Sequence, residues 1–377
     1  MTKSLKTSTI TLCTVFLLTT LGACRLVDAT APATNPAPPP PAQEPTANLP
    51  EPETTEAAAP ATAGDSGEDN PDEQPAGAVK HYAGIPDPSI AMGFDVWKDY
   101  PVSKRVKGER GRERVSCKGT PDKPCLIDAS EAQFVQLALS GEYAILQGGL
   151  VFAESDRGPW FYSDCHKCVI RDLKVLGTKT DNGHSSAIRM GDFNVWIRGK
   201  VRGFGDNRPN AREQDYHGMK IMRSDVWVLD AEIYDVSGDS IQVGDASRGA
   251  PERVYIGGGH FYDNRENAVD IKDSRDVVVS GVTMSGFRRT ASSSGEALIV
   301  HDDAFDAIIV NNTIRDTGIG IVSSGKSGHR IENNNIEARG VGIQIRSTRN
   351  ITVQDNEISA PRRIHVNGGG VSGSIQR

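Results

Sequence analysis

The chain has 377 residues, including 39 glycines and 21 prolines, and only 6% of its residues are aromatic. Its net charge of −7 is unevenly distributed, because residues 1–24 carry +2, residues 25–80 carry −8 and residues 81–377 carry only −1. A nearly neutral domain excludes a strongly basic nucleic-acid binder, and about 300 residues with regular apolar patterns exclude a wholly disordered chain.

Residues 1–24 have the pattern of a secretion signal. Lys3 and Lys6 form a positive start, and an apolar run too short to span a bilayer follows. The run ends in Leu21-Gly22-Ala23-Cys24, which resembles the lipobox of bacterial lipoproteins. The resemblance implies removal of residues 1–23, acylation of Cys24, and a lipid-anchored protein of the bacterial cell envelope. The alternative is an ordinary signal peptide cleaved near Ala23.

The residue after this cysteine, Arg25, bears on the compartment. An aspartate there would imply retention at the inner membrane, so the resemblance implies the outer membrane, on its periplasmic or its surface face. Residues 24–80 are rich in Pro, Ala, Thr and Glu. They hold too little apolar surface to offset the entropy cost of ordering, and we expect a disordered tether.

Four cysteines remain beyond the tether: Cys117, Cys125, Cys165 and Cys168. Because exported proteins favour disulfides, we expect these cysteines to be paired, although the spacing does not decide the connectivity. Half of a zinc site is the alternative for Cys165-His166-Lys167-Cys168, but the sequence has no second Cys/His pair at suitable spacing.

Residues 81–142 are predicted to form an N-terminal cap region. Asp128-Ala129-Ser130-Glu131, followed by Phe134, Leu137 and Leu139, has the pattern of a capped amphipathic helix. Such a helix would cover the open apolar end of the repetitive domain that follows it.

Residues 143–377 repeat one pattern, a short β-branched run followed by a turn. Two columns of apolar residues advance together through this region. The first column is Val175, Val201, Ile233, Phe261, Met284, Ile314, Ile336 and Ile358. The second column is Ile188, Met219, Ile241, Val269, Leu298, Ile321 and Ile343. Apolar residues at alternate positions predict strands, and no segment has the length or period of a helix.

The shortest repeat is 22 residues long, and asparagines recur just before the first column, at Asn311-Asn312, Asn333-Asn334-Asn335 and Asn356. This combination resembles the right-handed parallel β-helix of the pectate-lyase-like superfamily over about residues 143–360. The resemblance implies an all-β solenoid of about eight coils with asparagines stacked from coil to coil. It implies little about activity, because one fold supports many functions. We expect a monomer.

Polar residues with useful chemistry cluster around the second column. By the strand period of two, Arg189, Lys220, Gln242 and Asp270 are expected to face outward in one line, with Lys272, His301 and Arg346 near a neighbouring line. Where the turns enter the strands lie His217, Asp239, Asn267 and Glu296. Because coils stack about 4.8 Å apart, most of these side chains should converge in one patch.

Insertions precede several strands of the second column. In the C-terminal coils, a second-column residue follows the preceding first-column residue after seven positions. The same distance along the chain is 18 positions before Met219 and 14 before Leu298. Insertions on one face of a solenoid often mark the binding face. They would wall a groove suited to an extended acidic polysaccharide, with five predicted substrate-binding residues: Arg189, Gln242, Arg288, Arg289 and Arg346.

The reaction we expect in such a groove is β-elimination on a uronate-containing polysaccharide. It needs a base and a group that neutralises the substrate carboxylate. Lys220 or His217 is the expected base, with Lys272 or His301 as the alternative base or the acid. A Ca²⁺ ion on the substrate carboxylate is one option for the neutralising group, with four oxygen ligands: Asp239, Asn267, Asp270 and Glu296. The other option is that these four only pair with the lysines.

Two further functions fit the same groove. In inverting hydrolysis, two carboxylates cleave the glycosidic bond, and Asp239 with Asp270 or Asp302 with Asp303 would serve. The paired-aspartate and Gly-His-Gly motifs of β-helical polygalacturonases are absent, however, and Val300-His301-Asp302-Asp303 lacks the proline of the epimerase motif Asp-Pro-His-Asp. The remaining alternative is a lipoprotein that binds a glycan or a partner without catalysis.

Overall fold

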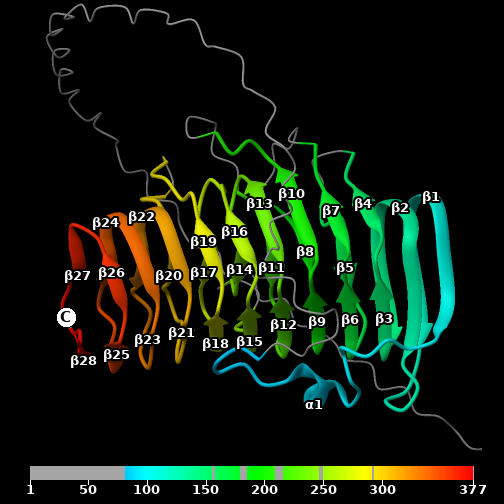
Figure 1. The fold of residues 1–377 in the computed structure, drawn as a ribbon, viewed down its shortest axis with the longest axis horizontal. Coiled ribbons are helices and arrows are strands. Elements are labelled where there is room, and N and C mark those ends of the chain that lie inside the picture. The colour runs from blue at the N-terminus through cyan, green and yellow to red at the C-terminus, as the bar shows by residue number, and fades with distance from the viewer. Residues whose placement is uncertain are drawn as a thin grey trace, which may run out of the picture. The chain divides into compact units, whose positions relative to one another are not determined.

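The computed structural model describes residues 81–154, 158–178, 185–208, 215–245, 249–290 and 293–376. The predicted signal peptide, the lipidation site Cys24 and the tether lie outside these ranges. No helix within them has the length and apolar character needed to span a membrane. The described part of the chain is a right-handed parallel β-helix, which Figure 1 shows side-on as one row of stacked coils.

Each coil contributes a strand to three parallel sheets. Sheet 1 contains β3 (Ala144–Gln147), β6 (Cys168–Arg171), β9 (Asn194–Ile197), β12 (Val226–Leu229), β15 (Glu252–Gly257), β18 (Arg275–Ser280), β21 (Ile308–Val310), β23 (Arg330–Glu332), β25 (Ile351–Gln354) and β28 (Gly373–Ile375). Sheet 2 contains β4 (Leu150–Phe152), β7 (Lys174–Leu176), β10 (Lys200–Phe204), β13 (Glu232–Val236), β16 (His260–Tyr262), β19 (Thr283–Ser285) and β26 (Glu357–Ser359). Sheet 3 contains β5 (Phe161–Ser163), β8 (Ser185–Arg189), β11 (Tyr216–Ile221), β14 (Ile241–Val243), β17 (Val269–Ile271), β20 (Glu296–Val300) and β27 (Arg362–Val366).

Four longer strands pass through more than one sheet. β22 (Thr313–Ser323) and β24 (Asn335–Ile345) run through sheets 2 and 3, whereas β1 (Val102–Lys118) and β2 (Cys125–Glu142) run through all three. The solenoid therefore begins at β1, ahead of the predicted boundary at residue 143, and has about eleven coils rather than eight.

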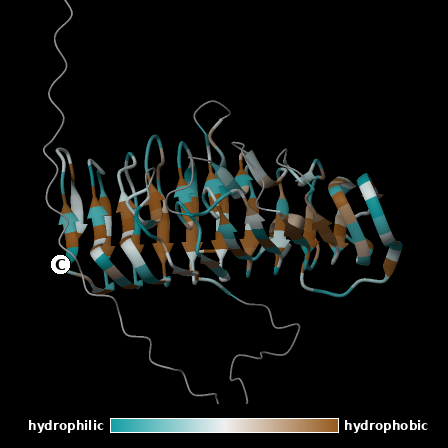
Figure 2. Ribbon diagram, turned by 90° about the horizontal axis from the view of Figure 1, so that it is seen from above, coloured by the Kyte–Doolittle hydropathy of each residue, from teal (hydrophilic) through white to brown (hydrophobic). Residues whose placement is uncertain are grey.

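Both predicted apolar columns are confirmed. Every neighbouring pair of the first column is a strand partner in sheet 2, from Val175 with Val201 to Ile336 with Ile358. Every neighbouring pair of the second column is a partner in sheet 3. All these residues except the last-coil Ile358 are buried in one continuous core, and apolar residues run through the whole row of coils in Figure 2.

The predicted capping helix is wrong, because residues 128–139 belong to strand β2. Phe134, Leu137 and Leu139 all point into the core, but from different sheets of one coil, because Phe134 pairs with β4 whereas Leu137 and Leu139 pair with β5. The helix α1 (Pro88–Met92) lies elsewhere, along the outside of sheet 1. It opens a strap whose Met92, Phe94 and Val96 cover the apolar outer surface of that sheet.

The predicted asparagine stack is also confirmed. The side chain of Asn312 donates to Oδ1 of Asn334 over 2.9 Å, and that of Asn334 donates to Oδ1 of Asn356 over 2.9 Å. Each residue before these asparagines (Asn311, Asn333 and Asp355) has a positive φ, a conformation that Asn and Asp tolerate better than most residues. The stack therefore satisfies the polar backbone at a sharp corner repeated in three coils.

The first coil ends the solenoid with a charged edge. β1 pairs only with β2, and seven basic side chains along it are exposed: Lys104, Arg105, Lys107, Arg110, Arg112, Arg114 and Lys118. The Cys117–Cys125 disulfide joins β1 to β2, and a second disulfide, Cys165–Cys168, brackets the turn before β6. Both pairs confirm the prediction of disulfides.

Candidate active site

A line of polar side chains crosses the outer side of sheet 3. Strand pairing places Arg189 beside Lys220, Lys220 beside Gln242, and Gln242 beside Asp270. The predicted outward line is thus confirmed. It lies over β8, β11, β14 and β17, which Figure 1 shows as neighbours in the middle of the row.

At one end of this line, Asp270 holds two cationic groups. Its Oδ1 lies 2.7 Å from Nε2 of His301, and its Oδ2 lies 2.9 Å from Nζ of Lys272. The carboxylate is buried, whereas the side chains of His301 and Lys272 are 24% and 28% exposed. A buried anion thus orients two basic groups that solvent, and a ligand, can reach.

The charges of this group shift its proton affinities. Burial alone would lower the pKa of His301 and that of Lys272, but the hydrogen bonds and charge of Asp270 outweigh burial and raise both. Burial would raise the pKa of Asp270, and the contacts with His301 and Lys272 lower it instead. Lys272 is therefore a cation at neutral pH, whereas His301 exchanges its proton above its usual pKa of 6.5.

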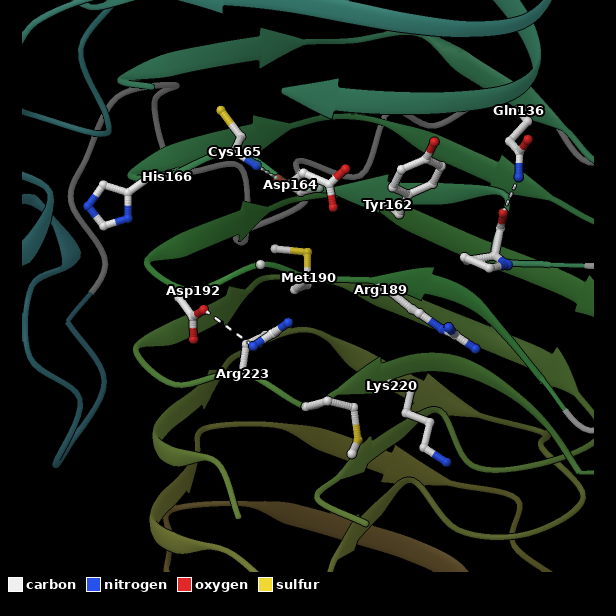
Figure 3. Close-up of a pocket in the computed structure, with 14 residues that line it drawn as sticks. Gln136, Tyr162, Asp164, Cys165, His166, Arg189, Met190, Asp192, Lys220 and Arg223 are labelled. Atoms are coloured by element: carbon white, nitrogen blue, oxygen red, sulfur yellow. Dashed lines mark hydrogen bonds and ion pairs between the residues drawn. The ribbon is translucent and has the colours of Figure 1, made fainter. Parts of the chain in front are cut away.

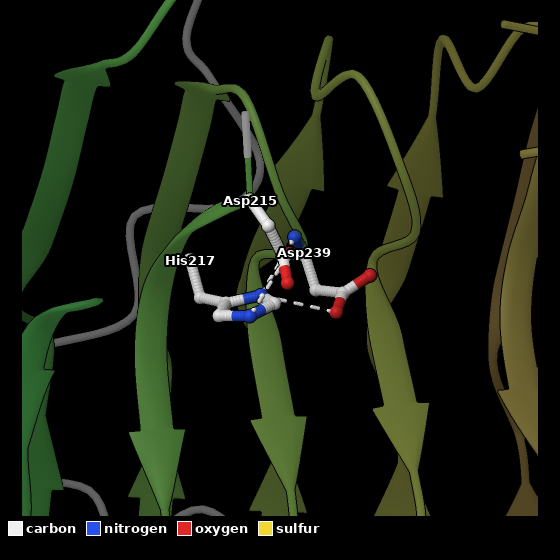
Figure 4. Close-up of side chains that lie close together, drawn as sticks. All are labelled: Asp215, His217 and Asp239. Carbon is white, nitrogen blue, oxygen red and sulfur yellow. Dashed lines mark hydrogen bonds and ion pairs between the residues drawn. The ribbon is translucent and has the colours of Figure 1, made fainter. Parts of the chain in front are cut away.

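A second histidine, His217, is clamped inside the same face. Its Nε2 lies 3.0 Å from Oδ1 of Asp215, and its Nδ1 lies 3.1 Å from Oδ2 of Asp239 (Figure 4). Burial alone would lower the pKa of His217, but the two carboxylates raise it to about 10. Its side chain is only 4% exposed, so a substrate cannot reach it.

Asp215 is a residue that sequence reasoning missed. It lies at the end of the insertion before β11, outside any motif and outside the strand pattern. The hydrogen bond to His217 overcomes the effect of burial and lowers the pKa of Asp215 to about 2. One ligand atom from each of Asp215, His217 and Asp239 lies within 4.8 Å of the others. The two carboxylates contact opposite nitrogens of the ring, however, and this geometry suits a trapped imidazolium better than a shared metal ion.

The four residues predicted as Ca²⁺ ligands all make contacts with protein groups. Oδ1 of Asp239 accepts from the backbone and side-chain amides of Asn267, and its Oδ2 faces His217. Asp270 is occupied by His301 and Lys272, and Glu296 accepts from Ser293 over 2.9 Å. These contacts occupy both oxygens of Asp239 and of Asp270, whereas Oδ1 of Asn267 has no partner among the described residues, so a Ca²⁺ ion held by all four residues stays a prediction.

Two buried amide oxygens in this region have no hydrogen-bond partner in the described part of the chain. They are Oε1 of Gln242 and Oδ1 of Asn267. Gln242 lies between Lys220 and Asp270 in the outward line. Because both oxygens are themselves buried, they are unsatisfied acceptors inside the site rather than contacts that a ligand reaches.

A pocket of about 770 Å³ continues the line beyond Lys220 (Figure 3). Arg189, Lys220 and Arg223 supply cations to its wall, and Tyr162 supplies a ring. The ammonium group of Lys220 lies 3.0 Å from Oδ2 of Asp245. The predicted base is therefore held by a carboxylate at the edge of the pocket, and the structure gives it no contact with the Asp270 group within the described ranges.

Three predicted substrate-binding arginines lie away from this cluster. Arg288 pairs with Asp316 over 3.2 Å, and Arg289 is exposed on the same loop. Arg346 donates to Gln344, two coils beyond the coil of His301. Among the residues that the structure describes, none of the three contacts Asp270, Lys272 or His301.

Comparisons with known proteins agree with the fold. The family model described as "Right handed beta helix region" matches residues 207–358 and 296–375. A comparison with curated protein sequences finds no match.

Three solved structures share the architecture. The A-module of a mannuronan C-5 epimerase from Azotobacter vinelandii is 16% identical, with a TM-score of 0.43 over 77% of this chain and 95% of that chain. A surface adhesin of Streptococcus pneumoniae is 10% identical, with a TM-score of 0.47 over 70% and 82%. An alginate lyase from a Paenibacillus species is 12% identical, with a TM-score of 0.38 over 71% and 90%. The stacked coils and the match of residues 207–375 to the family model show that this chain has the right-handed parallel β-helix fold.

Proposed function

We propose that the protein is a lyase that cleaves a uronate-containing polysaccharide by β-elimination. The observation that carries this proposal is the His301–Asp270–Lys272 group, in which a buried carboxylate orients an exchangeable histidine and a permanently charged lysine, two coils along the solenoid from the pocket wall at Lys220. β-Elimination needs this pair of functions: a base for the proton next to the carboxylate, and a cation that stabilises the negative charge developing there.

The roles follow from the contacts. Lys272 would bind the substrate carboxylate, because Asp270 keeps its ammonium group charged. In the neutral form of His301, the contact with Asp270 favours the hydrogen on Nε2, and Nδ1, which lies 3.2 Å from Oδ2 of the half-exposed Asp302, is the basic atom once Asp302 turns away. Nδ1 would take the proton from the carbon next to the carboxylate, the electron pair would form a carbon–carbon double bond, and the glycosidic oxygen would leave. The departing oxygen takes its proton from the new imidazolium or from water.

His217 and Lys220 receive other roles in this proposal than the base. His217 is buried between Asp215 and Asp239, and it would position these two carboxylates rather than touch the substrate. Lys220 stands at the boundary between the pocket and the outward line, and it would bind a carboxylate of the polymer.

Inverting hydrolysis has one observation in its favour. Burial and the charge of Asp270 raise the pKa of Asp239 while the pKa of Asp270 is lowered, and divergent carboxyl pKa values are typical of an acid and base pair. The side chain of Asp239 is only 1% exposed, however, and its oxygens are occupied. This location disfavours direct contact with a glycosidic oxygen.

The deciding experiment follows ultraviolet absorbance near 235 nm, where unsaturated uronate ends absorb, with alginate, pectate and glycosaminoglycans as substrates. We expect a rise with at least one polymer, lost in His301→Gln and Lys272→Ala. His260→Gln is the matched control, because His260 is exposed on β16 in another sheet. Reducing ends without absorbance would replace the lyase by a hydrolase, and the absence of both with every polymer would leave a binding module.

The cell location is part of the same proposal. An acidic polysaccharide is an extracellular or envelope polymer, and anchoring through Cys24 would hold the domain near it. Cys24→Ser should release the protein from the membrane pellet and change its electrophoretic mobility. A protein that still pellets with unchanged mobility would refute the lipid anchor without affecting the lyase.

A further inference from the structure

The pocket with cationic walls and the acid–base group lie on one continuous path. Tyr162 pairs with Arg189, and the same register continues through Lys220 and Gln242 to Asp270. These five residues span four coil steps, which corresponds to roughly 19 Å along the solenoid axis. A ligand that touches both His301 and the far wall of the pocket at Tyr162 must therefore be extended, and a polymer lying parallel to the axis meets this condition.

The wall of the pocket complements the two chemical features of a charged sugar, which are an apolar ring face and a carboxylate. Tyr162, Met190 and Met222 provide apolar surface, which suits the carbon–hydrogen face of a pyranose ring. Arg189, Lys220 and Arg223 provide cations on the same wall, and arginine binds carboxylates through paired hydrogen bonds. Figure 3 shows Arg189 and Lys220 extending in the same direction from neighbouring strands.

Acidic residues in the pocket are restrained by their neighbours. Asp164 accepts from Arg114 over 3.0 Å, and Asp192 accepts from the backbone amide of Ser224 over 3.0 Å. The distance from Arg223 to Asp192 is 3.9 Å, and the Arg223 side chain is 63% exposed. Such an exposed pair is weak, so a ligand carboxylate can recruit the guanidinium group of Arg223.

The opposite side of the acid–base group is different. Beyond Asp270 the outward line continues with Ile299 and then Val322, neither of which can bind a charged group. Along this line, the cations for a polyanion thus lie on the side of Asp270 toward the N-terminal coils.

We propose that this pocket is a remote subsite that binds a uronate residue of the same polymer chain, several sugars away from the bond that is cleaved. The identity of the ligand rests on the proposed function, whereas its size and charge follow from the pocket. Because remote contacts hold the substrate without touching the reacting atoms, this subsite should govern KM and the preference for long chains.

The test uses the full chain with His301→Gln, which stops turnover, and calorimetric titration with oligouronates of increasing length. Affinity should rise with length until the pocket is filled. Adding Arg189→Ala and Arg223→Ala should weaken the longest oligomers about 10-fold or more, since contacts of charged groups are lost, and should leave the shortest oligomers unchanged. Arg315→Ala is the matched control, because Arg315 is exposed on β22, away from the pocket.

The outcomes separate the two proposals. Unchanged affinity of the longest oligomers in the arginine variant would overturn the subsite, and equal binding of carboxyl-reduced oligomers would overturn its ligand class. Length-dependent, arginine-dependent binding together with a wild-type protein that cleaves no uronate polymer would sustain the subsite and overturn the lyase. In an active enzyme, we expect the arginine variant to raise KM on polymer far more than it lowers kcat.

Discussion

Nε2 of His301 lies 2.7 Å from Oδ1 of Asp270, and this contact decides which ring nitrogen is available for chemistry. Asp270 itself is buried and also holds Lys272. Orientation of the base and the charge on the neighbouring cation thus depend on one carboxylate.

Asp270→Asn should lower kcat by about 10²–10⁴-fold, because an amide holds neither the tautomer of His301 nor the charge of Lys272 as a carboxylate does. Absorbance near 235 nm measures the rate, and nuclear magnetic resonance follows the titration of His301. We also expect the pKa of His301 to fall in this variant, since its main stabilising anion is gone. Activity within twofold of the wild type would remove Asp270 from the mechanism.

The pH dependence of the reaction should have an acidic limb above the usual histidine value. The base is the neutral form of His301, whose pKa is raised from 6.5 by Asp270. Activity should therefore fall as pH drops through this raised value, and the limb should move toward lower pH in Asp302→Asn, because Asp302 also contacts the ring. A profile of kcat/KM against pH checks this; a flat profile between pH 5 and 9 would contradict a histidine base.

His217→Gln should destabilise the domain rather than abolish substrate binding. Loss of the imidazole leaves Asp239 buried without a cation, and such a change typically lowers the free energy of unfolding by about 3–5 kcal/mol. Thermal unfolding at neutral pH measures the loss. Ser186→Ala, one coil away at the paired position on β8, is the control, and a melting temperature equal to the wild type would refute the structural role of His217.

The same histidine predicts how stability varies with pH. Its pKa of about 10 exceeds the usual 6.5, so its contribution is complete below pH 6.5 and disappears as pH rises through about 10. Asp215, with a pKa lowered to about 2 from 3.8, contributes above pH 3.8 and loses its effect as pH falls through about 2. The raised pKa of Asp239 offsets part of this gain. Alkaline destabilisation should be smaller in His217→Gln, as measured by unfolding at pH 7 and pH 10.

Asn334→Ala should cost about 1–3 kcal/mol in the free energy of unfolding. The substitution leaves buried donors of Asn312 without their acceptor and removes the bond to Asn356. Denaturant unfolding measures this change. Asn335→Ala, which changes an exposed neighbour in the same asparagine triplet, should have almost no effect, and equal effects of the two variants would contradict the stack.

Removal of divalent cations should leave activity unchanged. The oxygens of Asp239 and Asp270 are already occupied by protein donors, and the mechanism assigns carboxylate neutralisation to Lys272. Rates measured after treatment with a chelator, before and after Ca²⁺ is restored, check this expectation. A loss of activity that Ca²⁺ restores would return the ion to the site.

The repeat of apolar residues was sufficient to predict the register of two of the three sheets, sheets 2 and 3. Val175 through Ile358 and Ile188 through Ile343 align in the structure as they align in the sequence, because each coil must bury an equivalent residue beside its neighbours. The coil that begins with β1 was not predicted, because its sequence does not show this apolar repeat. β1 is an edge with charged residues on most positions, and it lacks the pattern that burial imposes.

The candidate site was predicted as a set of residues but not as a set of contacts. Register alone placed Lys220, Gln242 and Asp270 in line. It could not reveal that Lys220 turns toward Asp245 while Lys272 turns toward Asp270, because rotamers and loop conformations decide those partners. Asp215 was missed because a single aspartate at the end of an insertion has no periodic position.

A solenoid has no inherent length, since each coil offers the next one the same unpaired backbone. In this protein the seven exposed cations along β1 place like charges where a second molecule would have to add its own first coil. Head-to-head growth of one domain on another would bring these rows together and be repelled. The net positive charge of β1, seven cations against Glu109 and Glu113, thus opposes the pairing of two first coils.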